Sequence, residues 1–430
     1  MPYRTLISVV ILYLIVTLLL TFCQSERGRI LDGQEAELSQ RADVQQVNIK
    51  VGAQQLLEKH LEGLKGQNIG LVMNPTARVN DVHVLDTLMA LGMPVKALFA
   101  AEHGFRGDQG AGEIIQDGLD EETGLPVFSL YGATKKPTAQ MLEEIDVLLF
   151  DMQDVGARFY TYNSTMKYVI EAAAEQGIEV WILDRPNPLG GDYVAGWVLE
   201  SEYNSFVGTY PIPIAHGLTL GELAQMALGE DWYDTDAKIN LRVIPMSGWQ
   251  RDMKWNDTQL KWVPPSPNLP TFEHAYAYIG TCLFEGTTLS EGRGTEHPFL
   301  MIGGENSRIN DDISLWSNHG VHLQPTQFTP VSIPGKALRP KGEGLLLNGI
   351  LWENALEHAD PLTIGLRMMQ WLMENSPEAA YKDYLYLLAG TDKIDELSRS
   401  RINLKSDSLD IDWGSNFESF KEKRSKYLLY

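Results

Sequence analysis

The chain has 430 residues, of which 44% are hydrophobic and 21% charged, a composition that excludes extensive disorder and allows a large core. Its formal net charge of −22 disfavours binding to phosphate backbones, and no basic stripe with interleaved aromatics offsets it, so we expect no nucleic-acid partner. At this length we expect two domains, or one domain with a second lobe.

The N-terminal residues differ in composition from the rest of the chain. Leu6 to Phe22 is almost purely apolar and follows a short polar start, which predicts a signal or lipoprotein leader over residues 1–22. Cys23 follows directly, at the position where bacterial lipoproteins are cleaved and acylated, although Phe22 is bulkier than the usual preceding residue. We expect lipidation of Cys23 and a membrane-anchored place in the cell envelope. A cleaved periplasmic protein and an uncleaved membrane anchor are the alternatives.

Residues 23–47 are polar and without periodicity, which predicts a tether between the leader and the folded body. Cys282 is the other cysteine of the chain, so a lipidated Cys23 leaves it no partner for an intramolecular disulfide. We therefore expect Cys282 to be a buried apolar side chain and the stability to come from packing.

From residue 48 onward, apolar runs rich in Val, Ile and Leu alternate with longer amphipathic segments. Such runs, separated by helical segments, are typical of a parallel sheet that is covered on both faces. We predict strands at residues 68–74, 95–100, 126–132, 146–154 and 178–184, and helices at residues 81–91, 137–145 and 160–176. The pattern indicates a doubly wound α/β domain over residues 48–262.

The segment WVPPSPNLP, residues 262–270, holds four prolines in nine residues and favours a stiff extended connector. A glycine-dense segment, mixed α/β sequence and a predicted helix at residues 361–375 follow it. We predict a second, smaller α/β domain over residues 271–430 that completes the ligand cleft.

Ligands of doubly wound sheets bind beyond the carboxyl ends of the strands, so polar residues directly after the apolar runs are candidate site residues. Each predicted strand is followed by such residues. They are Asn74, Glu102, His103, Tyr131, Asp151, Asp154, Asp184, Arg185 and Asn187. We expect a shared site at this edge of the sheet.

The segment AEHGFRG follows the second predicted strand. Desolvation at a partly apolar strand exit favours the protonated carboxyl that a general acid needs, which makes Glu102 the first catalytic candidate. Gly104 and Gly107 permit a substrate to approach closely. A surface carboxylate paired with Arg106 is the alternative. His103 acts directly or as a hydrogen-bonding support.

The segment DMQDVGARFYTY follows the most apolar predicted strand. Asp151 or Asp154 is expected to face the cleft, and Arg158 either neutralises one of them or binds an anionic substrate group. Tyr160 offers a stacking surface for a sugar ring. The alternative is that the carboxylates favour the following helix and the aromatics fill the core.

The segment FEGTTLSEGRGT and the residue after it concentrate charged side chains on a loop that can fold over the first domain's site, namely Glu285, Glu291, Arg293 and Glu296; a solvated surface loop is the alternative. Its glycine spacing fits neither a dinucleotide fingerprint nor a Walker loop. No zinc motif and no Gly-x-Ser-x-Gly elbow occurs in the chain. We expect neither a metal site nor a cofactor.

Six segments occur in order along the chain: GLVMNPTA, FAAEHGFRG, DMQDVGARFYTY, ILDRPNPLGG, WVPPSPNLPT and CLFEGTTLSEGRGT. With them the chain resembles the exo-β-N-acetylmuramidase family, formerly a domain-of-unknown-function family, over nearly all of the chain after the tether. The resemblance implies a Rossmann-like domain, a smaller C-terminal α/β domain and an active cleft between them. It also implies release of N-acetylmuramic acid from the non-reducing ends of peptidoglycan fragments, a step of cell-wall recycling.

The family's proposed catalytic glutamate falls on Glu102. From the resemblance and the motifs together we expect catalytic roles for Glu102, His103 and Asp151. We expect substrate contacts from Asn74, Asp154, Arg158, Tyr160, Glu285 and Arg293. The chain departs from the family pattern at His297, where we expect a basic residue before Pro-Phe, so substrate preference is less firmly implied than reaction class.

Glycosidic cleavage requires a carboxyl that protonates the leaving oxygen and a second group at the anomeric carbon. For the second role Asp151, Asp154, Glu285 and the substrate's own acetamido oxygen stay open. Arg158 or Arg293 is the expected partner of the muramic acid carboxylate. The alternatives to a glycosidase are a non-catalytic envelope lipoprotein that binds peptidoglycan fragments and an amidase or esterase.

Overall fold

The structure, a computed structural model, describes residues 48–106, 117–405 and 407–430. The predicted leader, the tether, Cys23 and Gly107 lie outside these residues. Within them, no helix has the length and apolar character that crossing a membrane requires.

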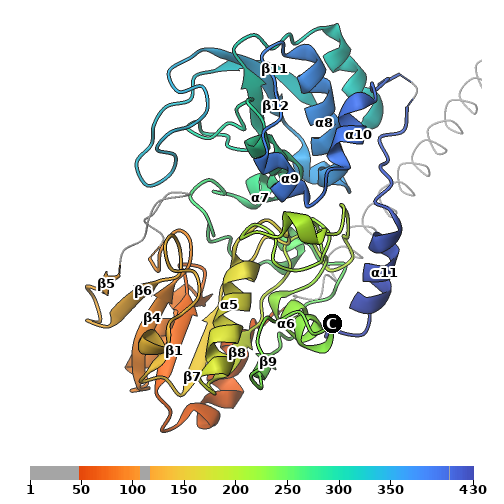
Figure 1. The fold of residues 1–430 in the computed structure, drawn as a ribbon. Coiled ribbons are helices and arrows are strands. Elements are labelled where there is room, and N and C mark those ends of the chain that lie inside the picture. Colours follow the sequence, from red (N-terminus) through yellow and green to blue (C-terminus); the bar gives the residue numbers. More distant parts are fainter. Residues whose placement is uncertain (1–47, 107–116, 406) are drawn as a thin grey trace, which may run out of the picture. The chain divides into compact units, whose positions relative to one another are not determined.

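Within the described residues, the first domain contains a seven-stranded sheet of order β5-β6-β4-β1-β7-β8-β9, in which neighbouring strands are parallel except β5 and β6 (Figure 1). Its strands are β1 (Ile69–Met73), β4 (Val95–Ala100), β5 (Gly118–Leu119), β6 (Pro126–Ser129), β7 (Val147–Asp151), β8 (Glu179–Leu183) and β9 (Asn240–Ile244). A small hairpin joins β2 (Arg78–Val79) to β3 (Val82–His83). The five predicted strands are confirmed as β1, β4, β6, β7 and β8.

The two faces of this sheet bury separate apolar clusters, because successive side chains of a strand point to opposite faces. In β7, Val147 and Leu149 belong to one cluster, together with Leu85 of α3. Leu148 and Phe150 belong to the other, together with residues of α5 and α6. The covering helices are α2 (Gly52–Gln55), α3 (Val84–Ala90), α4 (Ala139–Leu142), α5 (Tyr162–Glu175) and α6 (Leu220–Gly229). Helices on both faces confirm the doubly wound α/β class.

The sequence prediction lacks strand β9 and helix α6. Strand β9 contains Asn240 and an exposed Arg242, so NLRVI does not form a uniformly buried apolar run such as that of β1 or β7. Helix α6 begins at a capping box, in which the Thr219 hydroxyl accepts from the Glu222 amide and the Glu222 carboxylate accepts from the Thr219 amide.

The proline-rich segment at residues 262–270 forms neither helix nor strand, as predicted, and leads into α7 (Phe272–Thr281). The C-terminal domain has an antiparallel sheet of order β10-β12-β11. Its strands are β10 (Met301–Gly304), β11 (Leu323–Phe328) and β12 (Leu347–Trp352), and its later helices are α8 (Pro361–Asn375), α9 (Tyr384–Ala389), α10 (Ile394–Arg399) and α11 (Ser415–Arg424). Helix α8 confirms the helix predicted at residues 361–375.

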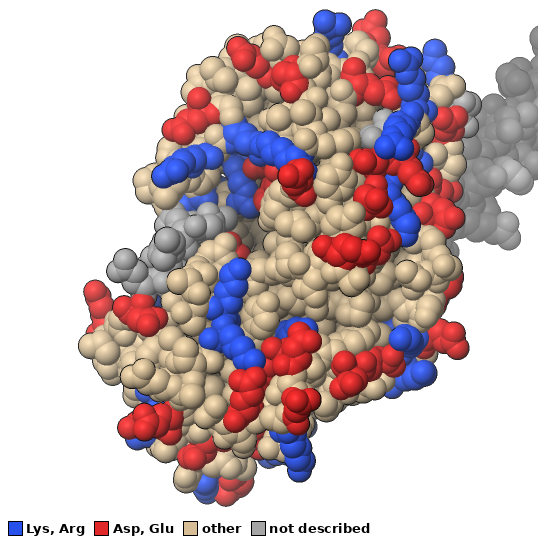
Figure 2. All heavy atoms as spheres, viewed as in Figure 1, with Lys and Arg blue, Asp and Glu red and all other residues tan. Residues whose placement is uncertain are grey.

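The two domains share one apolar cluster. Phe150 of the large sheet, Tyr278 of α7 and Ile350 of β12 are all buried within it. The C-terminal domain is therefore packed on the first domain through a continuous core rather than tethered beside it. On the face seen in Figure 2, acidic and basic side chains are interspersed, in keeping with two domains that are both charged at their surface.

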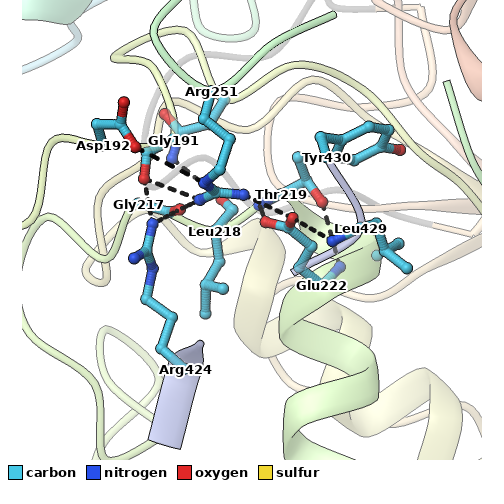
Figure 3. Close-up of polar contacts among 12 residues, drawn as sticks. Gly191, Asp192, Gly217, Leu218, Thr219, Glu222, Arg251, Arg424, Leu429 and Tyr430 are labelled. Carbon is cyan, nitrogen blue, oxygen red and sulfur yellow. Dashed lines mark hydrogen bonds and ion pairs between the residues drawn. The ribbon is translucent and has the colours of Figure 1, made fainter. Parts of the chain in front are cut away.

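The segment after α11 returns to the first domain (Figure 3). Arg424 donates to the carbonyl oxygens of Gly191 and Gly217, and Arg251 donates to the Glu222 carboxylate at 2.7 Å. The Leu429 amide donates to the same carboxylate at 2.9 Å. The contacts of Arg424 with Gly217 and of Leu429 with Glu222 each span 207 positions of the chain and place these C-terminal residues beside the start of helix α6.

Tyr430 completes this contact by covering Asp184, the residue directly after β8. Its hydroxyl donates to Asp184 Oδ2 at 2.7 Å, beside the Thr219 hydroxyl at 2.7 Å and the Gly221 amide at 2.9 Å. Burial raises the pKa of Asp184 to about 7, because these donors offset only part of the desolvation of the charged form. Asp184, one of the predicted strand-exit residues, is thus enclosed by the C-terminal segment.

Candidate active site

A cavity of about 530 Å³ opens between the carboxyl end of the large sheet and the C-terminal domain. Both domains supply its walls. The lining residues are Glu102, Tyr131, Glu285, Arg293, Lys336, Ala337, Leu338, Arg339, Pro340 and Tyr384. A smaller inner cavity of about 110 Å³ shares Glu102, Tyr131, Glu285, Arg293 and Tyr384 with it and adds mainly aromatic residues. A larger hollow of about 670 Å³ in the C-terminal domain contains none of the predicted site residues.

Glu102 reaches the cavity because the chain reverses directly after β4. His103 and Gly104 have φ angles of 76° and 81°, and the Gly104 amide donates to the Ala101 carbonyl oxygen at 3.1 Å. Gly104 adopts this left-handed conformation without strain, whereas His103 does so at some cost. The turn leaves Glu102 half-buried at the cavity wall and buries His103 behind it, where His103 lines the inner cavity.

Two hydroxyl groups position the Glu102 carboxylate. Thr161, the residue before α5, donates through Oγ1 to Glu102 Oε2 at 2.8 Å. Tyr131, which follows β6, lies beside the same carboxylate, and burial together with the charge of Glu102 raises the pKa of the Tyr131 phenol well above its usual value. Tyr131 therefore stays a neutral hydrogen-bond donor toward Glu102.

Glu285 and Arg293, which also line the cavity, form an ion pair. Arg293 donates to Glu285 Oε1 from Nη2 at 2.6 Å and from Nε at 3.2 Å, and Nε also lies 3.6 Å from Glu291 Oε1. Burial raises the pKa of Glu285 although Arg293 opposes this shift. Burial lowers the pKa of Arg293, but the carboxylates of Glu285 and Glu291 outweigh it and raise that pKa above its ordinary value.

Lys341 fixes the loop that carries this pair. Its ammonium group lies 2.8 Å from Glu291 Oε2 and donates to the carbonyl oxygens of Phe284, Thr287 and Leu289. The loop predicted from FEGTTLSEGRGT thus folds over the first domain's site as an ordered wall.

The chain matches the family description "Exo-beta-N-acetylmuramidase NamZ, N-terminal" over residues 69–273 and "Exo-beta-N-acetylmuramidase NamZ, C-terminal" over residues 276–430. The chain belongs to this exo-β-N-acetylmuramidase family of glycoside hydrolases. It is 37% identical over 414 residues to the peptidoglycan beta-N-acetylmuramidase NamZ of Bacillus subtilis strain 168, covering 94% of this chain and 96% of that protein.

Two solved structures from Bacteroides fragilis NCTC 9343, both described as DUF1343 family proteins, share the fold. One has a TM-score of 0.72 at 34% identity and covers 89% of this chain and 99% of that chain. The other has a TM-score of 0.75 at 32% identity and covers 90% and 100%. These matches confirm the resemblance on which the sequence analysis relied.

In this muramidase, the inner cavity is lined by aromatic side chains from both domains. Tyr160 packs edge-on against Tyr162, with ring centroids 4.7 Å apart, and against Tyr278 at 6.0 Å. Phe299 packs edge-on against Tyr278 at 4.8 Å, and Arg293 lies 4.9 Å from the Phe299 ring centroid. A wall of this kind excludes water and offers apolar surface to a sugar ring.

Asn74 and Asp151, at the exits of the adjacent strands β1 and β7, are fully buried and are not among the cavity-lining residues. Asn74 Oδ1 accepts from the Thr76 amide and hydroxyl, and Asp151 forms a bidentate ion pair with Arg185. Asn74 Oδ1 and the Asp151 carboxylate therefore have partners within the protein. The predicted direct roles of Asn74 and Asp151 stay predictions.

Asp154 and Arg158 are likewise absent from the cavity lining. Asp154 Oδ2 accepts from the Gly156 amide at 2.7 Å and lies 3.7 Å from His216 Nε2. Arg158 is fully buried, and burial lowers its pKa to about 9. Its guanidinium donates to the carbonyl oxygens of Trp197 (2.8 Å), Ile212 (3.0 Å) and, in the C-terminal domain, Leu388 (2.7 Å). The substrate contacts predicted for Asp154 and Arg158 stay predictions.

The structure brings together six of the predicted site residues: Glu102, His103, Tyr131, Tyr160, Glu285 and Arg293. The motifs did not indicate Thr161 as a partner of Glu102, nor Tyr384 and the segment 336–340 as cavity walls. Thr161 lies inside a quoted motif, whereas Tyr384 and the segment 336–340 carry no motif that singles them out. Among the described residues, no group of three or more His, Cys, Asp or Glu side chains is arranged to hold a metal ion.

Proposed function

We propose that this muramidase is an exo-acting glycoside hydrolase that releases N-acetylmuramic acid from the non-reducing ends of peptidoglycan fragments, with Glu102 as general acid and base. The observation that carries the proposal is the Glu102 carboxyl at the cavity wall, held by Thr161 and beside Tyr131. The similarity to a relative whose name gives it activity on peptidoglycan supports the substrate class.

In this mechanism Glu102 donates its proton to the glycosidic oxygen as the bond to the anomeric carbon breaks, and then accepts a proton from the attacking water. Thr161 and Tyr131 hold the carboxyl in place during both steps. Of the three carboxylates considered for the second role, Glu285 alone lines the cavity. Its ion pair with Arg293 weakens it as a nucleophile, which favours the acetamido oxygen of the substrate for attack and Glu285 for stabilising the resulting positive charge.

The test uses two disaccharides, one with N-acetylmuramic acid and one with N-acetylglucosamine at the non-reducing end, and mass spectrometry of the products. We expect free N-acetylmuramic acid from the first substrate and no product from the second. Release of longer fragments from polymeric peptidoglycan would contradict exo action. Saccharide binding without any release would support the non-catalytic carrier instead.

We further propose that the chain is exported and anchored in the cell envelope through lipid on Cys23, where it meets peptidoglycan fragments. We expect the unaltered chain in the membrane fraction of its host. Replacing Cys23 with Ala should abolish labelling of the chain by radiolabelled palmitate. An unlabelled chain that is soluble with Cys23 intact would contradict lipidation.

A further inference from the structure

Glu285 and Arg293 pair with each other in the cavity. The other charged residues that line it are two cations, Lys336 and Arg339, and one carboxylate, Glu102. Glu285 and Glu291 engage Arg293, and Glu291 also engages Lys341. Among the described contacts, Arg293 retains only Nη1 without a hydrogen-bond partner. Its charge is therefore balanced by carboxylates of the protein, and a further carboxylate from a substrate would meet the repulsion of both.

Two other cations line the outer part of the cavity. Lys336 is half-buried and Arg339 is exposed at the cavity wall. No ion pair or side-chain hydrogen bond of either group is found among the contacts of the described residues. Burial lowers the pKa of the Lys336 ammonium, and the charge of Glu296 offsets this only in part. Burial removes part of the water around the Lys336 ammonium, so an anion bound beside it would stabilise its charged form.

The backbone that carries these two side chains is fixed from several directions. Ile333 and Ala337 exchange two backbone hydrogen bonds, at 2.7 and 2.8 Å. Asn268 Nδ2 donates to the Lys336 carbonyl oxygen at 2.7 Å, and the Ser332 hydroxyl donates to the Leu338 carbonyl oxygen at 2.7 Å. The segment is thus held in place while its two charged side chains remain available, which is the arrangement expected of a preorganised binding wall.

An N-acetylmuramic acid unit differs from N-acetylglucosamine by a lactyl ether that ends in a carboxylate. Arg158 and Arg293 were the expected partners of this group, but Arg158 is fully buried on backbone carbonyl oxygens and Arg293 is engaged by two glutamates. His297 is also outside the cavity lining; its ring lies parallel to that of His274, with centroids 6.3 Å apart.

We propose that Lys336 and Arg339 bind the lactyl carboxylate and so select muramic acid over glucosamine. The proposal rests on the proposed function, since it assigns the specificity of the same cavity. Charge-assisted hydrogen bonds from an ammonium and a guanidinium give this carboxylate two partners, and the uncharged hydroxyl of glucosamine gains neither ion pair.

The test measures binding of three monosaccharides by calorimetry: N-acetylmuramic acid, its methyl ester and N-acetylglucosamine. The ester keeps the shape of the lactyl group and removes its charge. We expect the unaltered chain to bind the acid about 10- to 100-fold more tightly than the ester, and the Lys336→Met/Arg339→Met variant to bind both equally. The affinity for N-acetylglucosamine should not change between the two proteins.

The control is the Lys96→Met/Arg399→Met variant, which removes the same charges from exposed positions and should keep the preference for the acid. A preference that survives in Lys336→Met/Arg339→Met would overturn the proposal and point to Arg293. If this variant keeps the preference and still releases N-acetylmuramic acid from the disaccharide, the proposed function stands and only the role of Lys336 and Arg339 is wrong. If the unaltered chain neither binds these sugars nor releases N-acetylmuramic acid, both the proposed function and the proposed role of Lys336 and Arg339 are wrong.

Discussion

Replacing Glu102 with Gln should lower kcat on a muramyl disaccharide by about 10²- to 10⁴-fold, because the amide cannot give a proton to the departing oxygen. Gln keeps the size of the side chain and an oxygen that can accept from Thr161, so saccharide affinity should stay close to that of the unaltered chain. Rates and affinities measured on one preparation separate the loss of chemistry from a loss of binding.

The leaving group distinguishes an acid role for Glu102 from another catalytic role. A dinitrophenyl glycoside departs without a proton, so Glu102→Gln should slow its cleavage far less than that of the disaccharide. The exposed Glu143→Gln variant is the matched control and should be fully active. Equal losses on both substrates would show that Glu102 does not protonate the leaving group. A fully active Glu102→Gln variant would show that Glu102 has no catalytic role.

Replacing Arg158 with Met should lower the free energy of unfolding by about 3 to 5 kcal/mol. The guanidinium satisfies buried carbonyl oxygens of Trp197, Ile212 and Leu388, and each oxygen left without a donor carries a desolvation penalty of about 1 to 3 kcal/mol. Chemical denaturation gives this free energy. Because Leu388 also lines the inner cavity, KM should rise more than kcat falls.

Arg399→Met is the matched control for Arg158→Met, since the Arg399 side chain is 78% exposed and lies 3.9 Å from the Asp395 carboxylate. It should leave the unfolding free energy within about 0.5 kcal/mol. Arg158→Lys should remain destabilised, because one ammonium group cannot serve three carbonyl oxygens from two domains in the guanidinium geometry. An Arg158→Met variant as stable as this control would show that these hydrogen bonds contribute little.

The sequence predicts the sheet well because the parallel strands are buried on both faces and are therefore uniformly apolar. This pattern located β1 and β7, whereas β9, with its exposed Arg242, does not show it. A short apolar run thus suffices to locate a strand that is buried on both faces of the sheet. It does not locate β9, which lies at one edge of the sheet and is partly exposed.

The site was less predictable, because a polar residue after a strand has the same local sequence whether it faces a cavity or an internal partner. Glu102 and Asp151 both follow apolar strands, yet Glu102 lines the cavity whereas Asp151 is paired with Arg185 inside the protein. Lys336 and Tyr384 reach the cavity from more than two hundred residues beyond Glu102. Only the tertiary fold brings them there.

The contact between Tyr430 and Asp184 bears on the order in which the chain can fold. The hydroxyl comes from 246 positions further along the chain than the carboxyl that it covers. The first domain of a growing polypeptide therefore stays incomplete until Tyr430 has been synthesised. Folding of the two domains is coupled from end to end, and a fragment cut at the proline-rich connector would retain an uncovered acid and an apolar surface with nothing to bury it.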